Sequence, residues 1–434
     1  AYCNQAVCAP SRNNLLVGSR STSLGVYDLS VNFRRGAPDA VTMLQHFKNH
    51  GYHVSGVGKV FHIGHGNTDD PASWSEPFQP DKVIDYALPE STDGQLTREE
   101  AYFSNQALDR IGELPRGAAW ERADVPDEAY ADGRIAAEGV RRLQRAAQSD
   151  QPFFLALGFT KPHLPFCAPE KFWALYDGVE MPIATFREYP SGAPSYAAKW
   201  PLGELNQYKP IPEKPPLEDA TERTLVQGYY AALSFMDSQV GRVLDELDRL
   251  KLADDTIVVL WGDHGYHLGD HGAWTKHTNY EQANRIPLIF AGPGVSSQGA
   301  STQAMAETVD VFPTLSELAG LPAPQGPQSI DGVSLRPVLE DPSKSVKDHA
   351  YHAYPRGPRL GRAIRTSRYR LVEWKLQQGA RQAGGGDVPD VEYELYDYVE
   401  DPHETRNLAN DRPETLESMK SILSRHPEAR LPVR

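Results

Sequence analysis

A cysteine near the start of the chain has a setting suited to nucleophilic chemistry. Cys8 precedes Pro10, which fits the first turn of a helix because its missing N–H has no partner to lose there. The sequence therefore predicts Cys8 just before a helix N-terminus, where free backbone N–H groups and the helix dipole favour an anion. Arg12, four residues after Cys8, can reach back across this first turn. The alternatives for Cys8 are a small buried residue or a disulfide with Cys3.

Other polar side chains follow apolar runs that predict buried strands. These runs cover residues 53–57, 153–159 and 257–261. An apolar stripe at helical spacing predicts a long helix over residues 225–247. If the three strands share one sheet flanked by helices, the polar groups after them meet at one rim, where open α/β sheets bind ligands. The groups that follow the runs are Lys59 and His62, Lys161 and His163, and Asp263 and His264.

The last hundred residues have a different pattern. Basic, apolar and aromatic residues mix over 362–374 as in an edge strand, a second strand is predicted over 393–398, and a terminal helix over 413–425. We therefore expect a small domain built on an antiparallel sheet. Residues 81–126 and 166–216 have weak periodicity and are expected to be surface excursions that shape a pocket.

The chain resembles the formylglycine-dependent sulfatases, whose signature reads Cys-x-Pro-Ser-Arg, and residues 8–12 read Cys-Ala-Pro-Ser-Arg. Within that family the likeness is greatest to the iduronate-2-sulfatase subfamily, because residues 56–62, 161–166 and 263–272 repeat its blocks in order. The resemblance covers nearly the whole chain. It implies an alkaline-phosphatase-like catalytic domain over residues 1–340, with a mixed sheet flanked by helices, and a smaller C-terminal α+β domain over residues 341–434.

The resemblance also implies a mechanism and roles for residues. Cys8 would be oxidised to formylglycine, whose hydrate carries two hydroxyls on one carbon, one to attack sulfur and one to expel sulfate. His62 is the implied base for the second step, while Arg12 and Lys59 would hold the diol oxygens. His163 and Lys276 would bind the sulfate oxygens and protonate the leaving alcohol.

The resemblance also implies a divalent cation in the site. The family usually uses calcium, and magnesium is the less expected ion. Asp263, His264 and the modified Cys8 are the expected ligands. Calcium prefers oxygen ligands, so His264, where relatives often carry Asn, makes the metal's identity less certain. The family supplies two more Asp ligands upstream of the cysteine motif, and residues 1–7 contain none, so that strand is expected to be missing here.

The expected substrate is an O-sulfate ester of a sugar or uronic acid, such as a glycosaminoglycan fragment. The expected partners are this carbohydrate and a formylglycine-generating enzyme, and the resemblance implies export to a periplasm, the extracellular space or a lysosome. Indole rings stack on sugars, although burial in the core is the alternative for each Trp. The candidate substrate-binding residues are Lys161, Trp74, His267, Trp274 and His277.

Composition excludes several other functions. The chain has 44 Lys and Arg against 58 Asp and Glu, a net charge of -14, which argues against nucleic acid held by bulk electrostatics. No apolar run approaches the roughly 20 residues that span a bilayer. Two alternatives stay open, a phosphonate monoester or phosphodiester hydrolase of the same superfamily and a catalytically silent glycan-binding relative.

Overall fold

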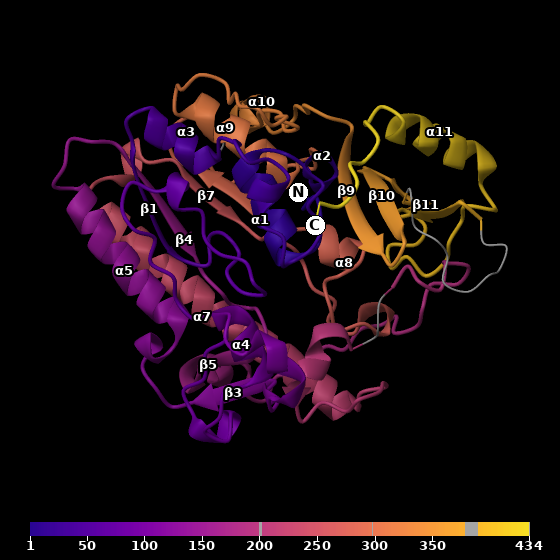
Figure 1. The fold of residues 1–434 in the computed structure, drawn as a ribbon, viewed down its shortest axis with the longest axis horizontal. Coiled ribbons are helices and arrows are strands. Elements are labelled where there is room, and N and C mark those ends of the chain that lie inside the picture. The colour runs from indigo at the N-terminus through magenta and orange to yellow at the C-terminus, as the bar shows by residue number, and fades with distance from the viewer. Residues whose placement is uncertain (199–201, 297, 378–388, 434) are drawn as a thin grey trace. The chain divides into compact units, whose positions relative to one another are not determined.

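Two compact units make up the chain in the computed structural model, which describes residues 1–198, 202–296, 298–377 and 389–433 (Figure 1). The first, which we call the Cys8 unit, consists of residues 1–43, 186–201 and 257–434. The second, the Lys59 unit, consists of residues 44–185 and 202–256. The predicted domain boundary at residue 340 is not one of the breaks between these units, and it stays a prediction. Among the described residues, no helix is both long and apolar enough to cross a bilayer.

The Lys59 unit contains a pair of parallel strands and two long helices. β1 (His53–Gly58) and β4 (Phe153–Gly158) pair with His53 opposite Phe153 and Gly58 opposite Gly158. α5 (Ala131–Ala146) contacts both strands and also α7 (Asp219–Arg249) (Figure 1). α7 confirms the helix predicted over residues 225–247, and both strands lie within one residue of the predicted runs.

Two glycines let the carboxyl ends of β1 and β4 come close together. Gly58 has a φ of +81°, a left-handed conformation in which a side chain would be strained. A Cβ on Gly158 would lie 2.1 Å from the carbonyl of Lys59, so only glycine fits there. The Lys59 amide donates to the Gly158 carbonyl at 2.7 Å. This contact fixes the point at which the segment carrying Lys59 and His62 leaves β1.

The segments predicted as surface excursions contain buried structure, which corrects that expectation. All four residues of the strand that begins at Phe166 are buried, and it pairs in parallel with the strand that begins at Trp120. Tyr130, Trp173 and Phe235 pack with these strands in one apolar cluster. The prediction was wrong because strands this short show no periodicity in the sequence. Their burial comes from α7, which packs on both strands. The elements are α4 (Arg98–Ser104), β2 (Gly117–Ala118), β3 (Trp120–Ala123), β5 (Phe166–Pro169), α6 (Glu170–Trp173) and β6 (Tyr208–Lys209).

The Cys8 unit begins with α1 (Cys8–Val17), a fully buried helix whose first residue is Cys8 itself. β7 (Val258–Trp261) confirms the third predicted strand, but it pairs antiparallel with β8 (Leu288–Ala291). Hydrogen bonds therefore pair two of the predicted strands, β1 and β4, with each other, while the third, β7, pairs with β8, for which no strand was predicted. The short helices are α2 (Ser21–Leu24), α8 (Glu281–Asn284), α9 (Val311–Leu318) and α10 (Arg336–Glu340). α3 (Met43–Asn49) belongs to the Lys59 unit except for its first residue.

A four-stranded antiparallel sheet forms the C-terminal part of the Cys8 unit, as predicted. Its strands follow chain order, and α11 (Pro413–Leu423) packs on it (Figure 1). The single strand predicted over residues 362–374 is two strands, because the backbone turns after Thr366, whose hydroxyl accepts from the Tyr369 amide at 3.0 Å. The strands are β9 (His349–Arg356), β10 (Arg359–Thr366), β11 (Tyr369–Leu376) and β12 (Val391–Asp397).

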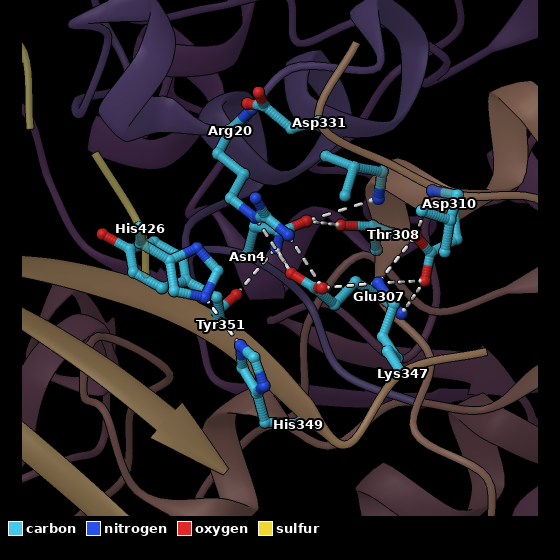
Figure 2. A network of polar contacts seen from close by, with 12 residues as sticks. Asn4, Arg20, Glu307, Thr308, Asp310, Asp331, Lys347, His349, Tyr351 and His426 are labelled. Carbon is cyan, nitrogen blue, oxygen red and sulfur yellow. Dashed lines mark hydrogen bonds and ion pairs between the residues drawn. The ribbon is translucent and has the colours of Figure 1, made fainter. Parts of the chain in front are cut away.

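A buried ionic network joins the start of the chain to this sheet (Figure 2). Glu307 accepts hydrogen bonds from Asn4, Arg20 and Lys347, and Lys347 also reaches Asp310. Burial alone would raise the pKa of Glu307, but the charges of Arg20 and Lys347 hold it below its ordinary range. Because an unpaired charge is costly in the interior, this network fixes the segment just before Cys8.

Candidate active site

Cys8 lies beside the polar turn that follows β7. Its Sγ is 3.3 Å from Nε2 of His264. His264 Nδ1 donates to the Gly265 carbonyl at 2.8 Å, which leaves Nε2 as the basic nitrogen that faces Cys8. No disulfide joins Cys8 to Cys3, so that alternative does not hold.

Arg12 and Asp263 complete this group. Arg12 Nε donates to Asp263 Oδ2 at 2.9 Å, and its guanidinium lies over the Trp261 ring at 5.7 Å from the centroid. The Ser11 hydroxyl donates to the Asp263 carbonyl. The first turn of α1 and the turn after β7, far apart in the sequence, thus hold each other in place.

The donor atoms of Cys8, Asp263 and His264 suit a divalent cation. All three lie within 4.8 Å of one another, close enough to share one ion. Burial alone would lower the pKa of His264, but the charges of Asp263 and Cys8 raise it above its ordinary value. A carboxylate, a sulfur and a histidine tautomer that presents Nε2 together make a donor set that a metal site can use. The residues present therefore fit a divalent cation, and Asp263 offers the carboxylate oxygen that calcium prefers.

Lys276 belongs to the loop that continues from this turn, and its side chain is buried. The charge of Lys276 lies close enough to His264 to oppose the protonation of that ring. The carbonyl of the next residue, His277, accepts a hydrogen bond from Arg356 on β9. The structure thus brings together Cys8, Arg12, Asp263, His264 and Lys276 within the Cys8 unit.

The Lys59 unit gathers the other predicted catalytic residues around one aromatic ring. Phe103, on α4, is the shared neighbour. Its ring centroid lies 5.0 Å from the Lys59 ammonium, 5.6 Å from the His62 ring and 5.3 Å from the His163 ring. Lys59 and His62 are both buried. An aromatic face attracts a cation and favours edge-on rings, so Phe103 restrains all three side chains.

His62 contacts a second histidine. His62 Nε2 is 3.3 Å from Nδ1 of His65, whose ring stacks on Tyr102 with centroids 4.7 Å apart. His65 has a φ of +56°, and its amide donates to the Tyr102 carbonyl at 2.7 Å. The stacking and the backbone contact orient the His65 ring, and through it the His62 ring.

His163 lies in a loop that is held from two sides. Its Nδ1 donates to the Leu164 carbonyl at 2.5 Å, so that Nε2 faces Glu204 Oε1 at 3.4 Å. Asp132, in the first turn of α5, accepts from the amide of Thr160 at 2.7 Å and from that of Lys161 at 3.0 Å. The position of His163 therefore depends on α5.

Several predicted substrate-binding residues lie in the interior. Lys161 is buried, and its ammonium donates to the Pro165 carbonyl at 2.7 Å, so it braces the His163 loop. Trp74 stacks on Phe78 with centroids 5.0 Å apart, and Trp274 is 1% exposed. The ring of His267 is fully buried and bonded to Thr278 and Asp270. These positions favour the core alternative for both tryptophans and leave only His277, partly buried, near a surface.

Sequence reasoning missed four residues of these clusters. Phe103 and Glu204 lie in segments with no periodicity, and nothing in their local sequence points to Lys59 or His163. Asp132 lies in the first turn of α5, where acidic residues are common because they interact favourably with the helix dipole. Its position in the sequence therefore did not point to the His163 loop. Only His65, three residues after His62, offered a signal in the sequence itself.

Comparisons with known proteins agree with this chemistry. The Sulfatase family model matches residues 1–321, and the model "N-sulphoglucosamine sulphohydrolase, C-terminal" matches residues 269–428. Iduronate 2-sulfatase of Homo sapiens is 31% identical, over 95% of this chain and 84% of that relative. A sulfatase of Formosa agariphila is 30% identical, over 98% of this chain and 78% of its own length.

Solved structures show the same fold. One is a protein in complex with its substrate D-glucosamine-2-N,6-O-disulfate, with a TM-score of 0.74, 20% identity, and coverage of 98% of this chain and 88% of that one. Another is a phosphonate monoester hydrolase from Silicibacter pomeroyi, with a TM-score of 0.72, 22% identity, and coverage of 98% and 86%. The predicted alkaline-phosphatase-like fold is confirmed. With a matching family model over most of its length and the polar clusters described above, the chain belongs to the sulfatase family of sulfuric ester hydrolases, and it is similar to iduronate 2-sulfatase.

Proposed function

We propose that this chain hydrolyses the O-sulfate ester of a sulfated sugar or uronic acid, with Cys8 as the nucleophilic position. The observation that supports this most is the meeting of Cys8, Asp263 and His264, whose donor atoms lie within 4.8 Å of one another beside Arg12. Oxidation of Cys8 to formylglycine, by a maturase, would supply a hydrated aldehyde with two hydroxyls on one carbon. Asp263, His264 and this hydrate would hold a divalent cation, calcium by expectation, that withdraws charge from the sulfate.

The protein's own side chains would carry the remaining tasks. Arg12, bonded to Asp263, offsets negative charge at the Cys8 position, and Lys276 donates to the sulfate oxygens. The proposal gives Lys59, His62 and His163 a part in the same reaction. His62 accepts the proton whose removal expels sulfate, and His163, with Glu204 at 3.4 Å, protonates the leaving alcohol.

The names of the relatives support a sulfated sugar as the substrate class, because they include iduronate 2-sulfatase and N-acetylglucosamine-6-O-sulfatase. Such substrates occur outside the cytosol, so the proposal includes export of the protein. Fractionation of cells that make this protein tests that part, because recovery outside the cytosol supports export and recovery with a cytosolic marker contradicts it.

The test of the proposed activity is turnover of 4-nitrophenyl sulfate by protein produced with a maturase. Wild type is expected to release nitrophenol, chelation to stop it, and added calcium to restore it. Cys8→Ala should abolish turnover with a nearly unchanged melting temperature, because little volume is lost. Equal or faster turnover of a phosphonate monoester would instead support the phosphonate hydrolase alternative, and turnover that survives Cys8→Ala would contradict the proposal.

A further inference from the structure

Arg356, at the end of β9, differs from the other arginines of the C-terminal sheet and of the turn between β10 and β11. Each of the others forms an ion pair with a carboxylate. The pairs are Arg359 with Glu392, Arg362 with Glu373, Arg365 with Glu281, Arg368 with Asp397 and Arg370 with Glu404. None of the carboxylates in the described part of the chain pairs with Arg356.

The surroundings of Arg356 leave its charge unbalanced. One guanidinium nitrogen donates to the His277 carbonyl, and Nε is shielded from solvent with no hydrogen-bond partner. The guanidinium lies 4.4 Å from the ring centroid of Tyr354. Burial lowers the pKa of Arg356, and the neighbours that oppose this are the phenols Tyr354, Tyr189 and Tyr280. Burial also raises the pKa of each of these phenols, so all three are neutral near pH 7.

Arg356 is connected to the candidate catalytic residues of its own unit. It holds the carbonyl of His277, the residue next to Lys276. The charges of Arg356 and Lys276 both act on Tyr354. Tyr354 and Arg356 project from the same face of β9, because residues two apart in a strand share a face. The His277 ring lies beside Tyr354, with centroids 6.0 Å apart. The Arg356 guanidinium, the Tyr354 phenol and the His277 ring thus lie together, and His277 is the residue next to Lys276.

A partly buried guanidinium without a carboxylate costs free energy unless an anion joins it. Arginine binds carboxylate and sulfate oxygens through its paired N–H groups, and such charge-assisted bonds are strong. We propose that Arg356, assisted by Tyr354 and His277, binds a second anionic group, a carboxylate or a second sulfate, on the sugar whose sulfate ester is hydrolysed at Cys8. This inference rests on the proposed function and narrows its substrate class to sugars with at least two anionic groups.

Three substrates separate the sources of this second anion. 4-Nitrophenyl sulfate carries one anion, a 2-O-sulfated uronic acid adds a carboxylate, and D-glucosamine-2-N,6-O-disulfate adds a sulfate. For Arg356→Gln we expect KM to rise about 10- to 100-fold for at least one of the two dianionic sugars relative to 4-nitrophenyl sulfate. The sugar that shows the rise identifies the preferred group. Arg356→Lys should recover part of the loss, because it keeps the charge without the paired N–H groups.

Arg425→Gln is the matched control, since it removes the same charge from an exposed arginine whose ion pair is with Asp348. A fall in turnover that is equal for all three substrates would overturn the inference, because it would show that Arg356 only supports the Lys276 loop. An unchanged KM for both sugars would also overturn it. If wild type hydrolyses none of the three, the proposed function fails. Calorimetric binding of the 2-O-sulfated uronic acid and the disulfated glucosamine to wild type and Arg356→Gln then decides the subsite alone.

Discussion

Phe103 has no reactive group, but its ring restrains the three candidate catalytic side chains that surround it. Lys59, His62 and His163 all lie against its ring, and the residue is 9% exposed. Phe103→Leu keeps the apolar volume near α4 but removes the flat face. We expect kcat for 4-nitrophenyl sulfate to fall about 10- to 100-fold, because small misplacements of catalytic groups are costly. Steady-state kinetics measure this.

Phe172→Leu controls for the loss of a buried ring in the same unit. Phe172 is 8% exposed, and its contacts lie in the cluster around Trp173 and Phe235. Its variant should lose comparable stability and keep kcat. Similar kcat values for the two leucine variants would show that Phe103 is only a packing residue.

The start of α5 holds the His163 loop through one carboxylate. Asp132 accepts from the Thr160 hydroxyl at 2.8 Å as well as from two backbone amides. Asp132→Asn has the same shape, but its amide nitrogen cannot accept these bonds. Asn keeps one oxygen, so one buried acceptor is lost, and with it one or two hydrogen bonds; this is expected to lower the free energy of unfolding by about 1–3 kcal/mol and to reduce turnover.

Urea unfolding and kinetics on the same preparation check this expectation. Asp150→Asn, in the exposed turn after α5, is the control for loss of a charge. If Asp132→Asn were as active as Asp150→Asn at equal stability, the loop would not depend on this carboxylate.

The sequence predicts two kinds of element best. α7 has an apolar stripe at helical spacing, because one face of the helix is buried, and β1, β4 and β7 are short continuous apolar runs. The pairing of these strands was not predicted, since hydrogen bonds between segments far apart leave no mark in either run. Side-chain contacts between distant segments likewise leave no mark in the sequence, so the two clusters of candidate catalytic residues were predicted only in part. Cys8, Asp263 and His264 were expected to meet, whereas Phe103 and Arg356 gain their significance only from contacts across the fold.

The unfolding equilibrium of the whole chain should depend on pH through buried histidines. Burial lowers the pKa of His271 from 6.5 to about 4. Between these values the unfolded chain binds a proton that the folded chain does not, so stability falls as pH falls through this window. One such histidine contributes up to about 1.4 kcal/mol per pH unit, or roughly 3 kcal/mol in all.

His271→Asn tests this contribution, because Asn tolerates the left-handed φ of +57° at this position and does not titrate. Its free energy of unfolding, measured in urea from pH 7 to pH 4, is expected to fall less steeply than that of wild type. Parallel curves for wild type and His271→Asn would contradict the prediction, because they would show that the pKa of His271 is the same in the folded and the unfolded chain.

The mass of the peptide that contains Cys8 tests the proposed chemistry most directly. Protein from a host with a formylglycine-generating maturase would be digested and the peptide that spans Cys8 analysed by mass spectrometry. We predict a peptide about 18 Da lighter than the cysteine form, in a fraction that rises in step with turnover of 4-nitrophenyl sulfate. An unmodified Cys8 peptide, in protein that still hydrolyses the sulfate ester, would contradict the role assigned to this residue.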